Sequence, residues 1–339
     1  MKKALTKTHR ASLFVLLGMM SVGCGNKSTS FSLPSTSQNF TQKVTYNNKV
    51  DILFVVDNSK SMLQYQQRLS AKVPDLVNTL NSLKMDYQVA VTTTTMATDK
   101  QTYPMTRQIL GDPKFLTSQN IQLLAQRLIV GESGSDNERG LDSLAYVTGS
   151  YAATFVPGFL RSDALFVVIF LGDENDNSTE FGNGDSSDFI NYMNRLKPPF
   201  KEGGQAWIAN YIGTIQNISC DILGGYVSVG KNYIRLVDAS HGVKESICNP
   251  DLSAAVADIK ARFIDQLTAY RLKEAPNKDS IVVKVDGVLI SQDSVNGWTL
   301  ETEIDTVTGG TNYLIRFHGT AIPAADQGIQ VEFTPAGAN

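Results

Sequence analysis

Histidine and cysteine are scarce in this sequence of 339 residues, which contains three of each. A zinc site built from histidines and a scaffold held by many disulfides are therefore excluded. Charged residues are also few, at 19%, and a formal net charge of -3 provides no basic excess for a general nucleic-acid binder. Hydrophobic residues make up 42% of the chain, which is enough for a substantial core.

Residues 1–23 are typical of a secretory signal. A basic start precedes an apolar run from Ala11 to Val22, which is too short for a resident transmembrane helix. The run ends in Ser-Val-Gly-Cys24, which resembles the lipobox of bacterial lipoproteins, although the family usually has Leu where Ser21 stands. The resemblance implies that the Cys24 thiol is diacylated and becomes the mature N-terminus. The alternative is an ordinary signal peptide with an incidental cysteine.

Gly25, rather than Asp, follows the cysteine, and the lipoprotein resemblance then implies the outer membrane. We therefore expect a protein of the cell envelope that contacts the membrane through a lipid. The leader holds four basic residues and no acidic one, so its removal takes the formal charge from -3 to -7. Residues 24–47 are rich in Ser, Thr and Asn, which predicts a flexible tether.

Two cysteines remain in the mature chain, Cys220 and Cys248. A secreted compartment is oxidising and the count is even, so a disulfide between them is the first interpretation. Two separate buried thiols are the alternative.

Strands and helices alternate through residues 48–275. Nearly continuous apolar runs at 50–56 and 164–171 predict parallel strands that are buried on both faces. Apolar residues from Met62 to Leu83 recur every three or four positions, which predicts an amphipathic helix. Further strands are expected at 87–93, 207–215 and 233–237, and further helices near 121–128, 141–148 and 256–270. This order predicts an α/β domain, a doubly wound and mostly parallel sheet with helices on both faces.

The periodicity changes to two after about residue 276. Apolar and polar residues alternate around 281–285, 298–304, 313–317 and 329–333, and Gly-containing turn pairs lie between these segments. Residues 276–339 are therefore expected to form a small C-terminal antiparallel β module of four strands.

Oxygen-bearing side chains follow two of the buried strands. Asp57, Ser59 and Ser61 stand at alternate positions after the first strand, and Asp173 follows the strand at 164–171. In open α/β sheets, ligands bind at the carboxyl ends of the strands. Purely structural roles are the alternative, because Ser is favoured at helix caps and Asp in strand-end turns.

This arrangement resembles the von Willebrand factor type A fold, whose metal-ion-dependent adhesion site has a DxSxS motif, a Thr on a later loop and an Asp after a central strand. Asp57, Ser59 and Ser61 match the motif, and Asp173 matches the strand-end Asp. Ser135 best matches the Thr, and Thr93, Thr94 and Thr95 are weaker candidates. Within the superfamily, the DNSKSM and AVTTT segments are similar to those of bacterial lipoproteins that carry such a domain.

The resemblance implies a divalent-cation site that docks another protein. All the ligands are hard oxygens, so the ion is expected to be Mg²⁺, Mn²⁺ or Ca²⁺. In the family pattern, hydroxyls contact the ion and carboxylates often act through water, so that the ion accepts an Asp or Glu from a partner. The expected function is therefore lipid-anchored, cation-dependent protein binding in adhesion or envelope assembly.

Two other functions are weighed against this one. A structural envelope lipoprotein with a non-functional site is the first alternative. A phosphatase-like hydrolase with Asp57 as phosphoacceptor is disfavoured, because Ser59 stands where a second Asp is required. No serine sits in a GxSxG elbow and no phosphate-binding glycine loop follows the first strand, so we expect no enzyme.

A run of acids follows Asp173 and suggests two further interpretations. A solvated acidic loop is preferred over a second cation site. The acids concerned are Glu174, Asp176, Glu180, Asp185 and Asp188.

Overall fold

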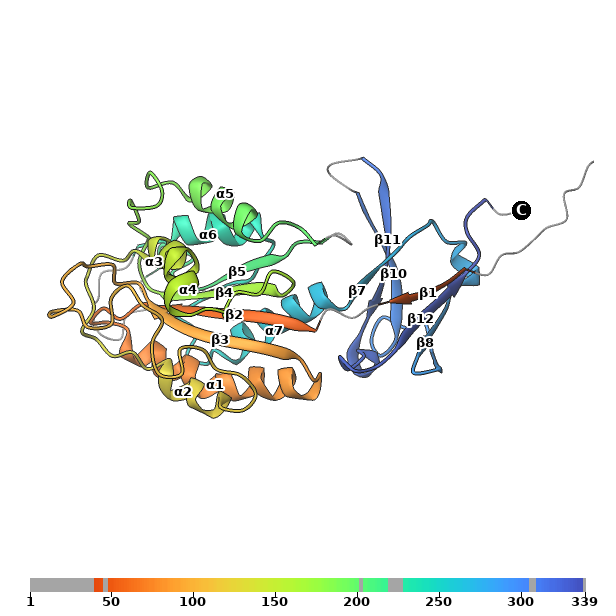
Figure 1. The fold of residues 1–339 in the computed structure, drawn as a ribbon, viewed down its shortest axis with the longest axis horizontal. Coiled ribbons are helices and arrows are strands. Elements are labelled where there is room, and N and C mark those ends of the chain that lie inside the picture. Colours follow the sequence, from red (N-terminus) through yellow and green to blue (C-terminus); the bar gives the residue numbers. More distant parts are fainter. Residues whose placement is uncertain (1–39, 45–47, 201–203, 219–227, 305–308, 338–339) are drawn as a thin grey trace, which may run out of the picture. The chain divides into compact units, whose positions relative to one another are not determined.

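A five-stranded, all-parallel sheet forms the centre of the α/β body (Figure 1). The computed structural model describes residues 40–44, 48–200, 204–218, 228–304 and 309–337. The strand order is β3-β2-β4-β5-β6, and each neighbouring pair is parallel. The strands are β2 (Lys49–Val56), β3 (Asp86–Thr93), β4 (Leu165–Gly172), β5 (Trp207–Gly213) and β6 (Lys244–Ser246). The predicted doubly wound α/β class is confirmed.

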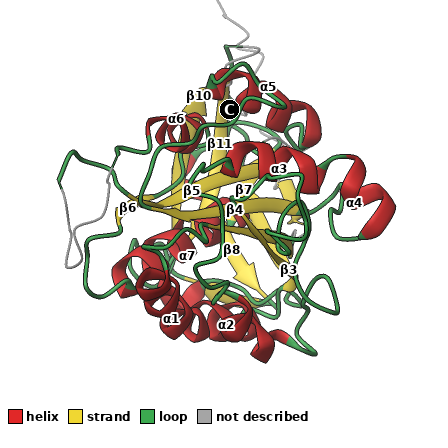
Figure 2. Cartoon of the chain, turned by 90° about the vertical axis from the view of Figure 1, so that its left-hand side faces the viewer, coloured by secondary structure: helices red, strands yellow, loops and turns green. Residues whose placement is uncertain are grey.

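Helices cover both faces of this sheet, as Figure 2 shows. One face carries α1 (Leu63–Ser82), α2 (Leu124–Arg127) and α7 (Ser253–Leu267), and the short 3-10 helix η1 (Ile121–Leu123) leads into α2. The other face carries α3 (Gly140–Thr148), α4 (Ser150–Phe155), α5 (Ser186–Leu196) and α6 (Lys231–Ala239). Two separate buried clusters result, one on each side of the sheet.

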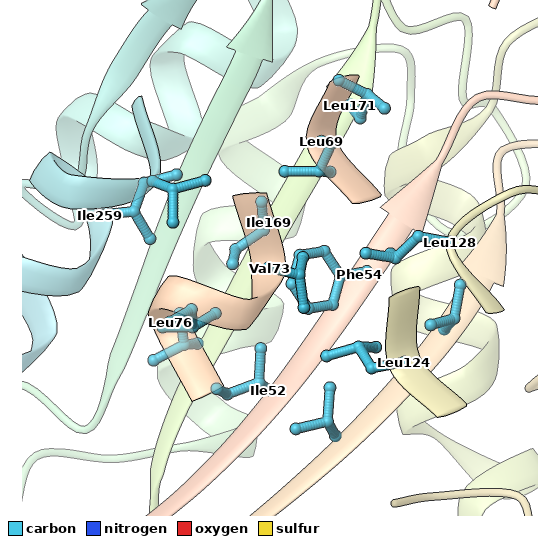
Figure 3. Packing of buried hydrophobic residues seen from close by; sticks show 14 of the residues in the cluster. Ile52, Phe54, Leu69, Val73, Leu76, Leu124, Leu128, Ile169, Leu171 and Ile259 are labelled. Atoms are coloured by element: carbon cyan, nitrogen blue, oxygen red, sulfur yellow. The ribbon is translucent and has the colours of Figure 1, made fainter. Parts of the chain in front are cut away.

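Strand β2 contributes to both clusters, which explains its continuous apolar sequence. Ile52 and Phe54 pack with α1 on one face, whereas Leu53 and Val55 belong to the opposite cluster. Figure 3 shows Phe54 beside Val73 of α1. Full burial of one such side chain stabilises the fold by about 1.5–3 kcal/mol. This packing fixes β2, and with it the position of the residues that follow it.

The segment at 233–237, predicted as a strand, is instead part of helix α6. Its buried residues are Tyr233, Leu236 and Val237, which are spaced three and four apart as on one helical face. A short apolar run does not distinguish a strand from a helix by periodicity alone. The helix predicted at 256–270 ends at Leu267, and Tyr270 lies in the following strand.

The C-terminal β module has two antiparallel sheets, with orders β1-β12-β8-β9 and β10-β11-β7. The four predicted strands are present as β8 (Val282–Val285), β10 (Trp298–Ile304), β11 (Thr311–Phe317) and β12 (Ile329–Phe333). The additional strands are β1 (Phe40–Val44), β7 (Ala269–Leu272) and β9 (Val288–Ile290), and the 3-10 helices are η2 (Lys278–Ser280) and η3 (Gly319–Ala321). Both sheets share one buried cluster that includes Trp298, Ile315 and Val331.

Two of the additional strands come from outside the predicted module. β1 lies in the segment predicted as a tether and pairs with β12, and β7 lies within 48–275 and pairs with β11. Main-chain pairing along a sheet edge does not require a strongly apolar strand, so the sequence pattern of neither segment predicts a strand.

Several expectations concern segments outside the described residues. The leader at 1–23, Cys24 and Cys220 all lie there. Cys248 is described and is disulfide-bonded, and its pairing with Cys220 remains a prediction. None of the described helices has the length and apolar character needed to cross a bilayer.

Candidate functional site

Asp57 stands where β2 ends, between the carboxyl ends of β3 and β4. Its amide donates to the Leu171 carbonyl of β4 at 2.9 Å, which continues the ladder by one residue. Its Oδ1 accepts the Ser59 amide at 2.8 Å, so the carboxylate organises the turn that follows. The side chain is fully buried, and its Oδ2 has no hydrogen-bond partner among the described residues.

The side chain of Gln66 in α1 holds this turn in place through hydrogen bonds. Its Nε2 donates to the Asp57 carbonyl at 2.8 Å and to the Gly131 carbonyl at 2.9 Å, while its Oε1 accepts the Gly131 amide at 3.0 Å. One buried amide side chain therefore joins the β2 turn to the loop that begins at Gly131.

Asp173 follows β4 and meets the DxSxS segment directly. Its Oδ2 accepts the Ser61 hydroxyl at 2.7 Å, and its carbonyl accepts the Thr214 hydroxyl at 2.7 Å. Its Oδ1 is buried without a partner in the described structure. The structure thus brings Asp57, Ser61 and Asp173 to one edge of the sheet, as the motif predicts.

Helix capping does not account for the two serines of the motif. α1 begins at Leu63, its N-cap residue is Met62, and no side chain caps it. Ser59 and Ser61 lie in the turn before the cap. The structural alternative of pure capping therefore lacks support from the geometry of α1.

The loop 131–138 lies over the strand ends and is clamped to them. The Gly134 amide donates to the Asn58 carbonyl at 2.7 Å. The Thr95 hydroxyl donates to Asn58 Oδ1 at 2.8 Å and accepts the Ser135 amide at 3.1 Å. A Cβ on Gly134 would lie 2.4 Å from Asn58 Oδ1, so only glycine allows this close approach.

Ser135, the hydroxyl matched to the family Thr, is half-buried in this loop. Its Oγ accepts the Asn137 amide at 3.1 Å, which is a local turn interaction. The buried side chain of the loop is instead Glu138, which is 2% exposed. Of the alternative threonines, Thr93 donates to the Met105 carbonyl, whereas the Thr94 hydroxyl lies beside Glu138.

Buried oxygen atoms that lack hydrogen-bond partners gather at this edge. Within the described residues they are Asp57 Oδ2, Asp173 Oδ1, Thr94 Oγ1 and both carboxylate oxygens of Glu138. Buried polar atoms are nearly always paired, so such a group requires an explanation such as a bound ion. Carboxylates and hydroxyls are the donors that Mg²⁺, Mn²⁺ and Ca²⁺ prefer, and this donor set fits such a cation.

Charge interactions in the site favour a bound cation as well. Burial first, and the negative charge of Asp173 second, raise the pKa of Asp57 to about 7. Burial and then the charge of Asp57 raise the pKa of Glu138 to about 10. Each carboxylate therefore disfavours ionisation of the others, and a cation would relieve both causes.

Asp, Glu, His and Cys side chains by themselves form no metal site in the described part of the chain. Among the described residues, no group of three or more His, Cys, Asp or Glu is arranged to hold one. Any cation at this edge therefore depends on hydroxyls as well, which is the pattern that the adhesion-site resemblance implies.

The acids after Asp173 only partly form the expected solvated loop, since Glu180 and Asp185 are exposed but make structural contacts. Asp176 is buried, and its Oδ1 accepts the Leu141 amide at 2.9 Å at the start of α3. Glu180 pairs with Arg107 and Arg139, and Asp185 caps α5 through the Ser187 amide. Among these acids, only Glu174 faces the site electrostatically: burial and the charge of Asp173 raise its pKa to about 7.

Glu138 is the site residue that the motif comparison missed. It lies three residues after Ser135, within the same segment, and a search for a hydroxyl passes over it. The sequence offered only its place two residues before Gly140, where α3 begins, because its burial shows only in the structure.

No protein-family model and no curated protein matches this chain. Several solved structures are similar to parts of this chain. Proximal thread matrix protein 1 of the mussel byssus, in a form with a zinc-occupied MIDAS motif, is 17% identical with a TM-score of 0.40, over 66% of this chain and 48% of that one. The pilus adhesin SpaC of Lactobacillus rhamnosus GG is 12% identical with a TM-score of 0.43, over 86% and 39%.

The pilus adhesin RrgA of Streptococcus pneumoniae is 8% identical with a TM-score of 0.36, over 88% of this chain and 58% of that one. The matched region is less than two thirds of the length of each of these proteins. With TM-scores below 0.5, these matches carry no conclusion about the function of this chain.

Proposed function

We propose that this chain is a lipid-anchored, divalent-cation-dependent protein-binding module of the cell envelope that acts in adhesion or envelope assembly. Its α/β body would be a von Willebrand factor type A domain. The supporting observation is the group of buried, unpartnered oxygens of Asp57, Asp173, Thr94 and Glu138 at the carboxyl ends of β2, β3 and β4.

The cation would be held by the hydroxyls of Ser59 and Ser61 together with the surrounding carboxylates. Asp57 and Asp173 balance its charge and orient the water molecules on it. Mg²⁺, Mn²⁺ and Ca²⁺ are the candidate ions, because each prefers oxygen ligands. The ion supplies an electrophilic point on the surface of the module at which an oxygen of another protein docks.

The anchor and the compartment are proposed from the sequence alone. Diacylated Cys24 would hold the chain at the outer membrane, and Cys248 would pair with Cys220, which is consistent with the disulfide-bonded state of Cys248. Peptide mapping without reductant tests this pairing. A fragment linking Cys248 to Cys24, or an unlinked Cys220 with Cys248 bonded elsewhere, would contradict it.

Mn²⁺ binding to the purified protein tests the central proposal. Calorimetry should show one site in the wild type and none in Asp57→Asn, which keeps the acceptor for the Ser59 amide but removes the charge. Asp75→Asn, on the exposed side of α1, is the matched control and should bind as the wild type does. Unchanged affinity in Asp57→Asn would refute the site.

Capture of partners from envelope extracts tests the binding role. The proposal expects proteins retained in Mg²⁺ that are released by a chelator, and expects Asp57→Asn to retain none of them. Retention that is insensitive to chelator would favour the structural lipoprotein over the adhesion module.

A further inference from the structure

The main chain around Glu138 is hydrogen-bonded to the loops that follow β3 and β4. The amide of the next residue, Arg139, donates to the Thr94 carbonyl after β3 at 3.1 Å, and the Glu138 carbonyl accepts the Asn177 amide after β4 at 2.7 Å. β2 lies between β3 and β4 in the sheet. The main chain at Glu138 therefore bridges the loops on either side of Asp57.

The Glu138 carboxylate is buried beside the other acids. It is 2% exposed, and the Thr94 hydroxyl lies beside it, but neither carboxylate oxygen accepts a hydrogen bond of regular geometry from the described residues. The negative charges of Asp57, Glu174 and Asp173 all act on it. No cation of the described side chains pairs with it, and an isolated buried carboxylate is strongly disfavoured. A bound cation supplies the missing counter-charge.

The number of carboxylates changes what the ion can accept from outside. In the family pattern the later loop contributes a neutral hydroxyl, which leaves the ion electron-poor and in need of an acid from a partner. With a divalent cation bound, Glu138 would add its negative charge to those of Asp57 and Asp173, and Glu174 would add a fourth nearby. Another carboxylate would enter a site that already repels anions.

We propose that the Glu138 carboxylate supports the cation site from beside it, as a third negative charge and not as part of a three-carboxylate ligand set, and that the ion accepts a neutral oxygen, a hydroxyl or carbonyl of a partner protein, instead of an acidic side chain. The inference rests on the proposed function, since it requires the cation. In this proposal, a neutral oxygen of the partner takes the place of the Asp or Glu that the family resemblance implies.

The affinity for Mn²⁺ tests the role of Glu138. Glu138→Gln keeps the size of the side chain and removes its charge, and loss of a group that supports metal ligands typically weakens affinity by about 10- to 100-fold. Glu132→Gln, at an exposed position of the same loop, is the matched control and should leave the affinity unchanged. Equal affinities in wild type and Glu138→Gln would overturn the proposal.

Acetate serves as a carboxylate probe for the partner position. Water-proton relaxation of the Mn²⁺-loaded protein reports exchangeable water on the ion. Acetate should leave this signal unchanged in the wild type and lower it in Glu138→Thr, which restores the family hydroxyl. Acetate displacing water from the wild type as readily as from Glu138→Thr would overturn the neutral-oxygen preference without relying on the folding of Glu138→Gln.

Asp57→Asn separates this inference from the proposed function. Loss of Mn²⁺ binding in Asp57→Asn with full binding in Glu138→Gln would refute the role of Glu138 and leave the cation-dependent module standing. Absence of Mn²⁺ binding in the wild type would refute both.

Discussion

The Ser61 hydroxyl donates to Asp173 Oδ2 at 2.7 Å, joining the turn before α1 to the end of β4 across 112 positions of sequence. A hydroxyl that donates its proton to a carboxylate keeps its lone pairs for another contact. That orientation is the one a hydroxyl ligand of a cation needs. The pair is therefore preorganised, with the second Asp173 oxygen buried and unpartnered beside it.

Substitution Ser61→Ala should weaken Mn²⁺ binding by about ten-fold, or about 1.4 kcal/mol. Its effect on the free energy of unfolding should be near 1 kcal/mol, since one hydrogen bond is lost. Ser82→Ala is the control, because the Ser82 hydroxyl bonds only the local Thr79 carbonyl at the exposed end of α1. Calorimetry and urea unfolding measure the two effects. Equal Mn²⁺ affinities in the two variants would contradict the role of Ser61.

Gly134→Ala should destabilise the protein and weaken cation binding together. The new Cβ would lie 2.4 Å from Asn58 Oδ1 and 2.6 Å from its carbonyl oxygen, so the loop must move away from the strand ends. Overpacking of this kind costs about 1–3 kcal/mol. Gly328→Ala is the control, since its nearest neighbour is at 3.5 Å. Denaturant midpoints and Mn²⁺ titration test it, and a Gly134→Ala protein with wild-type values in both would show that the clamp is unimportant.

The parallel sheet was predictable because burial on both faces produces continuous apolar runs. β2 and β4 are buried throughout their apolar stretch, and such runs are rare outside buried strands and helices. α6 was not predictable as a helix because its apolar residues cover only Tyr233–Val237, too few for a period to show. β1 and β7 depend on edge pairing with distant strands, which leaves no local pattern.

The residues of the candidate site also fall into a predictable and an unpredictable group, for physical reasons. Asp57, Ser61 and Asp173 follow strand ends, so the topology alone brings them together. Glu138 and Gln66 owe their roles to burial and to contacts with loops far along the chain, and neither is visible from spacing. A hydroxyl search in the 131–140 loop selects Ser135, whereas desolvation singles out the carboxylate of Glu138.

Gln66→Leu should destabilise the fold by about 2–4 kcal/mol, because the Gly131 amide and the carbonyls of Asp57 and Gly131 lose their shared partner in a buried place. Gln67→Leu, one residue on and exposed, should change stability by less than about 0.5 kcal/mol. Urea unfolding measures both. A Gln66→Leu protein as stable as Gln67→Leu would show that the β2 turn and the 131–138 loop hold their places independently.

The raised pKa of Asp57 links protein stability to pH. Its usual value is 3.8 and its value in the fold is about 7, mainly through burial. Between these values the folded protein keeps a proton that the unfolded chain releases. Through Asp57, the cation-free protein should therefore lose stability as pH rises from about 4 to 7, by a few kcal/mol at most, and Glu138, whose pKa is raised to about 10, should extend the fall above pH 7.

A bound cation should reverse this dependence, because protons and the cation compete for the same carboxylates. Mg²⁺ or Mn²⁺ is expected to raise the melting temperature clearly at pH 8 and little at pH 5. In Asp57→Asn, both the fall in stability with pH and the cation effect should shrink. Melting curves of wild type and Asp57→Asn at pH 5, 6, 7 and 8, each with chelator and with Mn²⁺, provide the measurement. A wild-type melting temperature that Mn²⁺ raises equally at pH 5 and pH 8 would show that no buried carboxylate exchanges its proton for the ion.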